Sequence, residues 1–365
     1  MLDNQTAPPT IQALLEEMVR ADASDLHLVP EHPPMYRVHG DLLPSNLAPL
    51  AASTVTDMIA AVVPAALRDR FHTALNLDFS VEIDAADGTH QRFRGNSFRA
   101  QGAFCGCFRH IPEHIPSFEW MGFPRHVAEE IAELTNGLVI VTGITGSGKS
   151  TTLAAIVNLL NERGGFRIIT VEEPIEYIYR RTERSVVTQR EVGIDCESFF
   201  SGLKYGLRQD PDVILVGEIR DRETAQMALS AAETGHLILT TMHTKDAKGA
   251  VSRFVDLFEP TTHDDIRAQL AFNLRYVIAQ HLLPSAKPGE KRALALETML
   301  VNNPVRAGIK LGKLEAIESA IQTGRANGMI RLDDSLQALL AMNKISLDTA
   351  RRFAKSPDTI APRPV

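Results

Sequence analysis

The pattern of hydrophobic and polar residues predicts a small mixed domain in the first part of the chain. "TIQALLEEMVRA" places Ile11, Leu14, Leu15 and Met18 on one face of a helix. "LDFSVEI" instead places apolar residues at every second position, from Leu77 to Ile83, which predicts a half-buried strand. "QRFRGNSFRA" and "GAFCGCFRHI" are predicted as further strands. Residues 1–112 are therefore expected to form an α+β domain.

The apolar runs become continuous after Arg125. "LVIVT", "IITV", "VILVG" and "LILTTM" alternate with helical segments, which is typical of a parallel sheet covered on both faces. The apolar positions of two of these helices recur at helical spacing, and they are Leu153, Ile156, Val157 and Leu160 in one and Ala225, Ala228, Leu229 and Ala232 in the other. The chain from about Asn303 is predicted to be helical. Residues 125–365 are thus expected to form an α/β domain with a helical C-terminal region.

The segment between these two regions is predicted to be a linker. "PEHIPSFEWMGFP" holds three prolines around the single tryptophan of the chain, and residues 113–124 are expected to join the domains. An ordinary proline-rich surface loop is the alternative.

Composition and charge disfavour several classes of protein. The chain has 365 residues, of which 44% are hydrophobic and 23% charged, as expected of a globular protein with two domains. A formal net charge of −7 disfavours nonspecific nucleic-acid binding, so no nucleic-acid partner is expected. No signal peptide or membrane-spanning run is evident, which predicts a cytoplasmic protein that reaches a membrane only through a partner.

The cysteines do not predict a metal site. The chain contains Cys105, Cys107 and Cys196, an odd and sparse set that fits a reducing compartment. Cys105 and Cys107 form one C-x-C without a second pair, so they are interpreted as strand residues on one face rather than as zinc ligands.

"GITGSGKS" is the strongest chemical signal. It matches G-x-x-x-x-G-K-[ST] between an apolar strand and a helix, the context of a phosphate-binding P-loop. Backbone N–H groups and the positive end of the following helix are expected to hold the phosphates of ATP, Lys149 to reach the β- and γ-phosphates, and Ser150 to bind Mg²⁺. The predicted nucleotide-binding residues are Gly143, Thr145, Gly146, Ser147, Gly148, Lys149, Ser150 and Thr151.

Two acidic segments follow the P-loop. "DVILVGEIRD" resembles a Walker B strand in which Gly217 stands where many P-loop proteins have an aspartate, and Glu218 is predicted to orient or deprotonate the attacking water. "TVEEPIEY" carries Glu172, Glu173 and Glu176 at the predicted carboxyl edge of the sheet. Glu172 and Glu176 are expected to contribute to Mg²⁺ binding together with Ser150. A solvated charge cluster is the alternative.

Histidines and arginines supply further candidates. His236 and His243 flank the strand "LILTTM" and are candidates for sensing the γ-phosphate or for coupling it to a neighbouring subunit, against the alternative of structural hydrogen bonding. Arg92, Arg94 and Arg109 lie on predicted strands, where a guanidinium can contact a γ-phosphate in trans if subunits form a ring. Ordinary surface arginines are the alternative.

These motifs together resemble the PilT-type type IV pilus retraction ATPases of the secretion ATPase superfamily. The resemblance rests on "ASDLHL", "RFRGN", "GITGSGKSTTLAAIV", "TVEEPIEY", "LRQDPDVILVGEIRDRETAQMALSAAETGHLILTTMHT" and "SAIQTGRANGM". It implies a PAS-like N-terminal domain, a RecA-like ATPase domain and a homohexameric ring that hydrolyses ATP with Mg²⁺ to power pilus retraction and twitching motility. It also implies an inner-membrane platform protein as partner, possible cooperation with a paralogous retraction ATPase, and a peripheral location at the inner membrane. By this resemblance Glu218, Glu172, Arg92, Arg94, Arg109, His236 and His243 take part in catalysis.

The sequence departs from the family pattern in three places. Glu173 stands where the acidic box usually has an aspartate, and Gly95 stands where a valine is usual. "NNPVRAGIK" replaces the Ala-Ile-Arg motif tied to retraction, with Arg306 as the remaining arginine. An accessory retraction ATPase or a related secretion-system motor is therefore the alternative function, and a nucleic-acid translocase or a non-hydrolysing scaffold are rivals from other classes.

Overall fold

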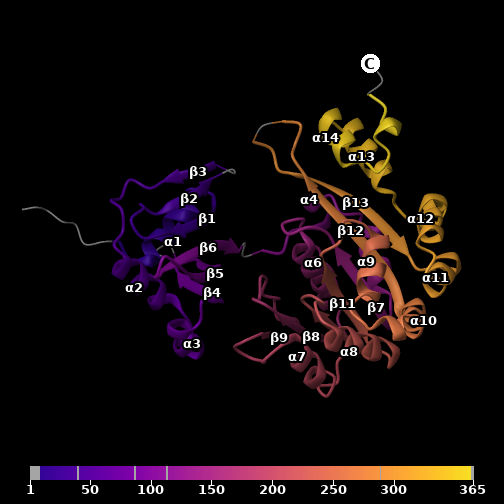
Figure 1. Cartoon of the computed structure of the whole chain (residues 1–365), viewed down its shortest axis with the longest axis horizontal. Helices are drawn as coiled ribbons and strands as arrows, with labels where there is room; N and C mark the ends of the chain where they lie inside the picture. Colours follow the sequence, from indigo (N-terminus) through magenta and orange to yellow (C-terminus); the bar gives the residue numbers. More distant parts are fainter. Residues whose placement is uncertain (1–8, 39–40, 86–87, 112–113, 288, 363–365) are drawn as a thin grey trace, which may run out of the picture. The chain divides into compact units, whose positions relative to one another are not determined.

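The computed structural model divides the chain into two compact units (Figure 1). It describes residues 9–38, 41–85, 88–111, 114–287 and 289–362. The first unit comprises Met1–His114 with Glu173–Ile178 and Glu191–Asp195, and the second comprises Ile115–Glu172, Tyr179–Arg190 and Cys196–Val365. The first residue of the predicted linker, Glu113, lies outside the described residues, and the short helix α4 (Phe118–Met121) forms within the remainder of that segment.

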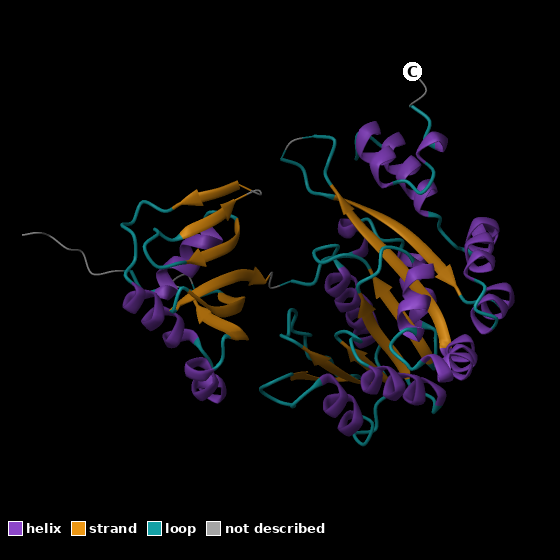
Figure 2. Ribbon diagram, in the orientation of Figure 1, coloured by secondary structure: helices purple, strands orange, loops and turns teal. Residues whose placement is uncertain are grey.

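The first unit is an antiparallel sheet with helices on one face (Figure 2). The strand order is β3-β2-β1-β6-β5-β4. The strands are β1 (Ala23–Leu28), β2 (Met35–Val38), β3 (Asp41–Pro44), β4 (Asn76–Asp84), β5 (His90–Ala100) and β6 (Ala103–Ile111). The helices are α1 (Ile11–Arg20), α2 (Ala52–Val62) and α3 (Arg68–Thr73).

Alternation along the strands divides this sheet into an apolar and a polar face. Phe79, Phe93 and Phe108 come from three neighbouring strands and are fully buried against the helices. The predicted helix and strand patterns in this part are confirmed, because the predicted apolar positions of α1 and β4 are all buried. The opposite face carries the arginines considered below.

Gly95 is explained by the packing of this core. A Cβ atom built at Gly95 lies 2.7 Å from Cε2 of Phe79, closer than real Cβ atoms approach an aromatic carbon. The glycine therefore leaves room for the Phe79 ring, and a valine at this position requires that ring to move.

The second unit contains a seven-stranded sheet of order β13-β12-β7-β11-β10-β8-β9. Its strands are β7 (Gly137–Thr142), β8 (Arg167–Glu172), β9 (Val186–Glu191), β10 (Val213–Val216), β11 (Leu237–Met242), β12 (Leu274–Leu283) and β13 (Ala293–Leu300). The pairs β12–β7, β7–β11, β11–β10 and β10–β8 are parallel, as the continuous apolar runs predicted. β13 pairs antiparallel with β12, so the sheet ends in a hairpin that the apolar runs did not reveal.

Helices cover this sheet, and further helices follow β13 in the C-terminal part of the chain (Figures 1 and 2). They are α5 (Arg125–Ala132), α6 (Lys149–Arg163), α7 (Phe199–Gly206), α8 (Arg222–Glu233), α9 (Ala247–Val255), α10 (His263–Asn273), α11 (Asn303–Lys310), α12 (Leu314–Thr323), α13 (Leu332–Ala341) and α14 (Leu347–Phe353). The predicted apolar faces of α6 and α8 are buried. The last helices pack on the β12–β13 hairpin around Leu283, Ala295 and Leu336.

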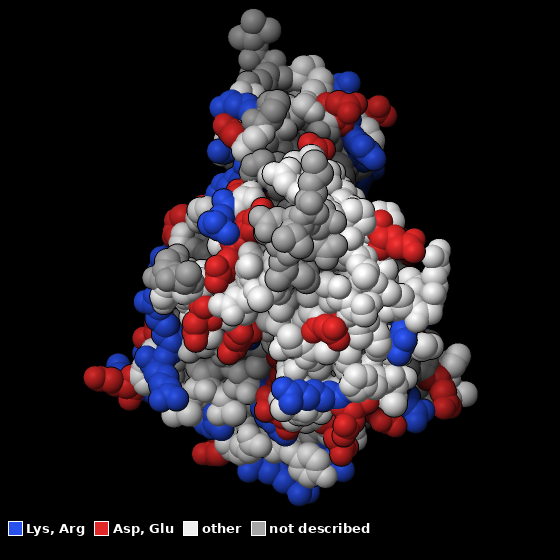
Figure 3. Space-filling model, turned by 90° about the vertical axis from the view of Figure 1, so that its left-hand side faces the viewer, with Lys and Arg blue, Asp and Glu red and all other residues white. Residues whose placement is uncertain are grey.

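Two surface findings bear on partners. Among the described residues visible in Figure 3, basic and acidic side chains intermingle. Among the described residues, no helix has both the length and the apolar character needed to cross a bilayer.

Candidate nucleotide-binding and hydrolysis site

The P-loop joins the end of β7 to the start of α6, where glycines allow a backbone path that other residues disfavour. Gly143, Gly146 and Gly148 all have positive φ, at 149°, 78° and 88°. A Cβ atom at Gly143 lies 2.5 Å from the carbonyl oxygen of Gln280 on β12, so a larger residue does not fit against the neighbouring strand. The loop thus turns at the carboxyl edge of the sheet and presents the first turn of α6 to an anion.

Lys149 is held by the loop that it follows. Its Nζ donates to the carbonyl oxygens of Gly143 at 2.9 Å and Ile144 at 3.2 Å. Thr145, Gly146 and Ser150 are exposed, while Ser147 is buried. The ammonium group of Lys149 is therefore bound to carbonyl oxygens of the loop. The phosphate oxygens of a nucleotide would compete with these carbonyl oxygens for it.

Glu218 and His243 lie at the ends of two adjacent strands beside this loop. Glu218 follows β10 and His243 follows β11, and Nε2 of His243 is 3.1 Å from Oε2 of Glu218. Nδ1 of His243 is 3.5 Å from Nζ of Lys149. Because an ammonium group only donates, Nδ1 accepts there, and Nε2 carries the proton that is donated to Glu218. Arg220 pairs with the other oxygen of Glu218.

Gly217 precedes Glu218 in a confined position. A Cβ atom built there lies 3.1 Å from the Phe199 ring and 3.3 Å from the Val171 carbonyl oxygen. A side chain as large as aspartate is thus disfavoured at this point of the strand. Glu218 is the carboxylate that β10 brings to the site, with a side chain that is only 13% exposed.

The acidic segment "TVEEPIEY" is divided between the two units. Glu172 ends β8 in the second unit, where its Oε1 accepts from the Thr170 hydroxyl at 2.6 Å and from the Gln189 amide at 3.3 Å. Glu173 and Glu176 group with the first unit. Within the second unit, only Glu172 of the three therefore lies on the strand edge that carries Glu218.

The three arginines lie on one polar face of the first unit's sheet. Arg94 on β5 is directly opposite Arg109 on β6, and Arg92 is two residues before Arg94, so all three share a face. Arg92 Nε donates to Glu82 at 2.9 Å, and Arg94 lies 3.7 Å from Asp78.

Arg109 and Arg92 differ in how their donors are used. Arg109 Nε donates to the buried carboxylate of Asp25 at 2.8 Å. Burial works against the charged guanidinium of Arg109, but Asp25 outweighs it and raises the pKa. Arg92 Nη2 donates to the Ile175 carbonyl oxygen at 3.2 Å, while Nη1 is buried without a hydrogen-bond partner among the described residues. One donor of Arg92 is therefore buried and unused among the described residues.

The structure does not bring His236 to the P-loop of its own chain. His236 precedes β11, at the amino edge of the sheet, and its Nδ1 lies 3.0 Å from the Ala231 carbonyl oxygen. His243 follows the same strand at the opposite edge. Within the second unit the two histidines therefore have different surroundings, and a role for His236 toward a neighbouring subunit stays a prediction.

Arg292 is a site residue that the sequence reasoning missed. It immediately precedes β13 in the β12–β13 hairpin, and its Nη1 lies 3.4 Å from the Gly146 carbonyl oxygen of the P-loop. The preceding Lys291 lies over the Trp120 ring, with Nζ 4.4 Å from its centroid. The basic pair "KR" at residues 291–292 was the available signal, but spacing along the chain does not reveal that the hairpin returns to the P-loop.

These elements define a P-loop ATPase domain, with a carboxylate and a histidine positioned beside the phosphate loop at the carboxyl edge of a mainly parallel sheet. The sequence profile described as "Type II/IV secretion system protein" matches residues 2–352, and the chain belongs to that family.

Relatives over nearly the whole length refine this assignment. The chain is 40% identical over 328 residues to a twitching motility protein of Neisseria gonorrhoeae, covering 90% of this chain and 86% of the relative. It is 40% identical over 348 residues to the type IV pilus retraction ATPase PilT of Pseudomonas aeruginosa, covering 95% and 99%. The crystal structure of the pilus retraction motor PilT with bound ADP is similar with a TM-score of 0.84 at 36% identity, covering 96% of this chain and 98% of that chain.

These similarities confirm the resemblance to PilT-type ATPases, the two-part α/β fold and the ATPase activity predicted from the sequence. Binding of ATP and ADP follows from the same relationship.

Proposed function

We propose that the chain is a motor that hydrolyses ATP to power retraction of type IV pili, and thereby twitching motility, as a homohexamer. The observation that carries the proposal is the contact of Lys149, His243 and Glu218 at the carboxyl edges of β7, β11 and β10. Full-length similarity to a pilus retraction ATPase supports the coupling of this hydrolysis to pili.

In the proposed reaction, water attacks the γ-phosphorus of ATP as the bond from that phosphorus to the oxygen of ADP breaks. Glu218 accepts the proton of the attacking water, and ADP and phosphate leave. His243 orients the Glu218 carboxylate through Nε2, and Lys149 exchanges its loop carbonyls for the phosphate oxygens. The chemistry is positioning and charge stabilisation, since phosphoryl transfer requires little covalent participation by the protein.

Mg²⁺ fits the oxygen donors present at this edge. Ser150 exposes its hydroxyl in the first turn of α6, and Glu172 offers a carboxylate at the end of β8. Hydroxyl and carboxylate oxygens are ligands that Mg²⁺ prefers, directly or through water. Ser150 would hold the ion and Glu172 would hold its water shell. When bound, the ion neutralises charge on the β- and γ-phosphates.

The first unit would transmit the motion. Arg92, Arg94 and Arg109 are proposed to contact the nucleotide of a neighbouring subunit, where guanidinium groups would stabilise charge on the phosphates. Hydrolysis would then release that contact and rotate one domain against another. The motion would be passed to an inner-membrane platform protein, which places the motor in the cytoplasm at the inner membrane, with a paralogous ATPase as an additional partner.

A second candidate, an accessory retraction ATPase or a secretion-system motor, is favoured by the sequence of α11. Arg306 there donates from Nε to the Ala271 carbonyl oxygen of α10 at 3.0 Å and from Nη1 to Asn303 at 3.3 Å. The arginine that matches the retraction motif thus binds within its own domain.

A pilus count in a deletion strain tests the function. Complementation with the wild-type copy should restore normal pilus numbers and twitching, whereas the Glu218→Gln copy should leave excess pili and no twitching. Normal pilus numbers in the deletion strain would favour the accessory or secretion motor. Absence of pili would place the chain in assembly and contradict retraction.

A further inference from the structure

Residues 243–246 connect β11 to α9. Together with Ala247, the first residue of α9, they form the segment called here the 243–247 loop, which carries His243 beside the nucleotide site. Its second residue, Thr244, is bound to Thr142, the last residue of β7. The Thr142 hydroxyl accepts from the Thr244 backbone N–H at 2.8 Å and lies 2.8 Å from the Thr244 hydroxyl. The 243–247 loop is therefore fixed on its P-loop side by the strand that leads into the P-loop.

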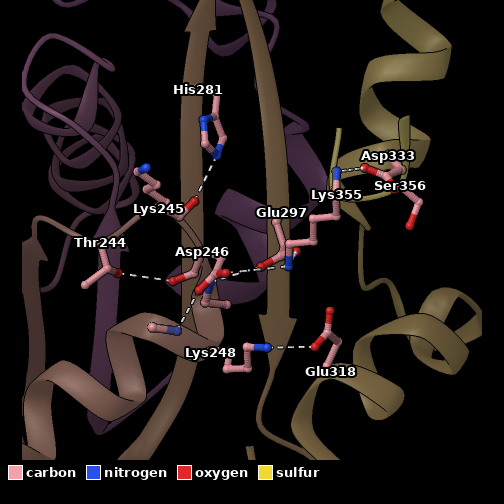
Figure 4. Close-up of polar contacts among 12 residues, drawn as sticks. Thr244, Lys245, Asp246, Lys248, His281, Glu297, Glu318, Asp333, Lys355 and Ser356 are labelled. Atoms are coloured by element: carbon pink, nitrogen blue, oxygen red, sulfur yellow. Dashed lines mark hydrogen bonds and ion pairs between the residues drawn. The ribbon is translucent and has the colours of Figure 1, made fainter. Parts of the chain in front are cut away.

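β12 fixes the middle of the same loop. Nε2 of His281 lies 2.9 Å from the Lys245 carbonyl oxygen, so this nitrogen donates and carries the ring proton (Figure 4). Burial lowers the pKa of His281, which favours the neutral ring.

The far end of the loop is held by an ion pair from the C-terminal region. Glu297 on β13 is 2% exposed, accepts the Ala247 backbone N–H at 3.0 Å through Oε1, and pairs through Oε2 with Nζ of Lys355. The same Nζ lies 3.9 Å from Asp246, which caps α9 by accepting from the Gly249 N–H at 2.6 Å. One cation thus faces both carboxylates that define where the 243–247 loop ends (Figure 4).

Lys355 is itself held in place by the C-terminal helices. It lies just after α14, and the Asp333 carboxylate at the start of α13 accepts the backbone N–H groups of Lys355 at 2.8 Å and Ser356 at 3.0 Å. Asp333 is 7% exposed. These two hydrogen bonds restrict the backbone at Lys355, so its side chain extends to Glu297 from a well-defined backbone position.

We propose that Lys355 is a positioning residue for ATP hydrolysis, which links the C-terminal helices to His243 through Glu297, Asp246 and the 243–247 loop. A buried carboxylate without its cation is costly, so loss of Lys355 forces Glu297 to protonate or to move toward water. Either response shifts the Ala247 N–H contact and with it the loop that orients His243 on Glu218. Small displacements of positioned groups have large effects on rate.

The inference rests on the proposed roles of His243 and Glu218 in hydrolysis. It adds that α13 and α14, far along the chain from the P-loop, set how well those two residues are aligned. A partner or modification that displaces Lys355 would accordingly slow the motor without contacting the nucleotide.

The test compares Lys355→Met, Lys355→Arg and Lys248→Met in the full-length chain. Lys248 is the matched control because it is a lysine on α9, next to the 243–247 loop, whose ion-pair partner is Glu318 at 2.7 Å instead of Glu297. ATP turnover, KM for ATP, ADP affinity and thermal unfolding are measured for each.

Lys355→Met should lower kcat about tenfold while KM and ADP affinity stay within about twofold, and Lys355→Arg should recover most of the rate. Lys248→Met should keep the wild-type kcat. A parallel loss of kcat and ADP affinity in folded Lys355→Met, or an unchanged kcat, would overturn the inference. If Lys355→Met does not fold, Lys355→Gln, which retains a donor for Glu297, is judged by the same outcomes.

Measurement of Glu218→Gln in the same series separates this inference from the proposed function. Normal turnover by Glu218→Gln overturns the hydrolysis mechanism and the inference with it. Loss of turnover by Glu218→Gln together with normal kcat for Lys355→Met overturns the inference alone.

Discussion

His243 lies between Lys149 and Glu218, with one ring nitrogen 3.5 Å from the lysine Nζ and the other 3.1 Å from a glutamate oxygen. The imidazole thus connects the lysine proposed to hold the phosphates to the carboxylate proposed to face the attacking water. If Lys149 moves onto a nucleotide, the change in its contact with the His243 ring would alter the position of Glu218. Substitutions of Glu218 and Lys149 are therefore expected to affect different steps, turnover and nucleotide binding respectively.

Glu218→Gln should leave nucleotide binding intact and stop turnover. The amide keeps the shape of the side chain and a hydrogen-bonding oxygen but cannot take a proton from water, so kcat should fall by about 10²- to 10⁴-fold. Steady-state phosphate release and ADP calorimetry measure the two effects. Glu233→Gln, an exposed carboxamide substitution at the end of α8, is the control and should turn over normally. Normal turnover by Glu218→Gln would remove its assignment as the base.

Lys149→Ala should abolish productive nucleotide binding. Its ammonium group contacts the Gly143 and Ile144 carbonyl oxygens of the P-loop, whose backbone is proposed to receive the phosphates. Calorimetric titration with ADP should show binding weakened by at least about tenfold, since a charged hydrogen bond contributes roughly 1.5–3 kcal/mol. Lys310→Ala, at an exposed position in α11, should bind ADP normally. Wild-type affinity in Lys149→Ala would be inconsistent with this site.

Arg292→Ala should weaken ADP binding about tenfold, because a guanidinium 3.4 Å from the P-loop is lost. Trp120, the single tryptophan, lies beside Lys291 and serves as a fluorescence reporter of nucleotide addition. Arg222→Ala is the matched control, since Arg222 pairs with Glu259 on the surface at 3.1 Å. Equal affinities in the two variants would show that Arg292 does not contribute to binding.

Gly95→Val should destabilise the first unit. The new side chain meets the buried Phe79 ring, and overpacking of this kind costs about 1–3 kcal/mol of unfolding free energy. Urea unfolding measures the change. The double variant Gly95→Val with Phe79→Leu should recover part of the loss, because the smaller side chain frees the space; equal instability of the single and double variants would argue against this contact.

Stability should fall as the pH is lowered from about 7 to about 5. Burial lowers the pKa of His27, His110 and His281 below the ordinary value of 6.5. As the pH falls, the unfolded chain therefore binds protons on these rings before the folded chain does. The contribution of the neutral rings to stability is fully present above about pH 6.5 and is lost as the pH falls toward the folded-state pKa values. Chemical unfolding across this pH range measures it.

His281→Gln tests one of these rings separately. The amide can still donate to the Lys245 carbonyl oxygen but does not titrate, so the pH dependence should become shallower. His90 provides the contrast: its hydrogen bond to Asp84 raises its pKa, but the side chain is half exposed and contributes little. An unchanged slope in His281→Gln would assign the pH dependence to other groups.

Local patterns were sufficient for most elements. The apolar positions of α1, β4, α6 and α8 were all read from periodicity, because a helix or strand face is set by residues within a few positions of one another. The P-loop was identified for the same reason: its glycines and lysine act within eight consecutive residues. Similarity to related proteins then confirmed the family and its ATPase activity.

The sequence by itself therefore determined the two folds, the phosphate loop and the class of reaction. Only the tertiary structure decided which distant residues meet. It placed His243, but not His236, beside Lys149 and Glu218, turned Arg292 back to the P-loop through a hairpin, and brought Lys355 to Glu297 across 58 positions. Such contacts depend on strand order and on the packing of the C-terminal helices, and periodicity along one segment carries no information about either.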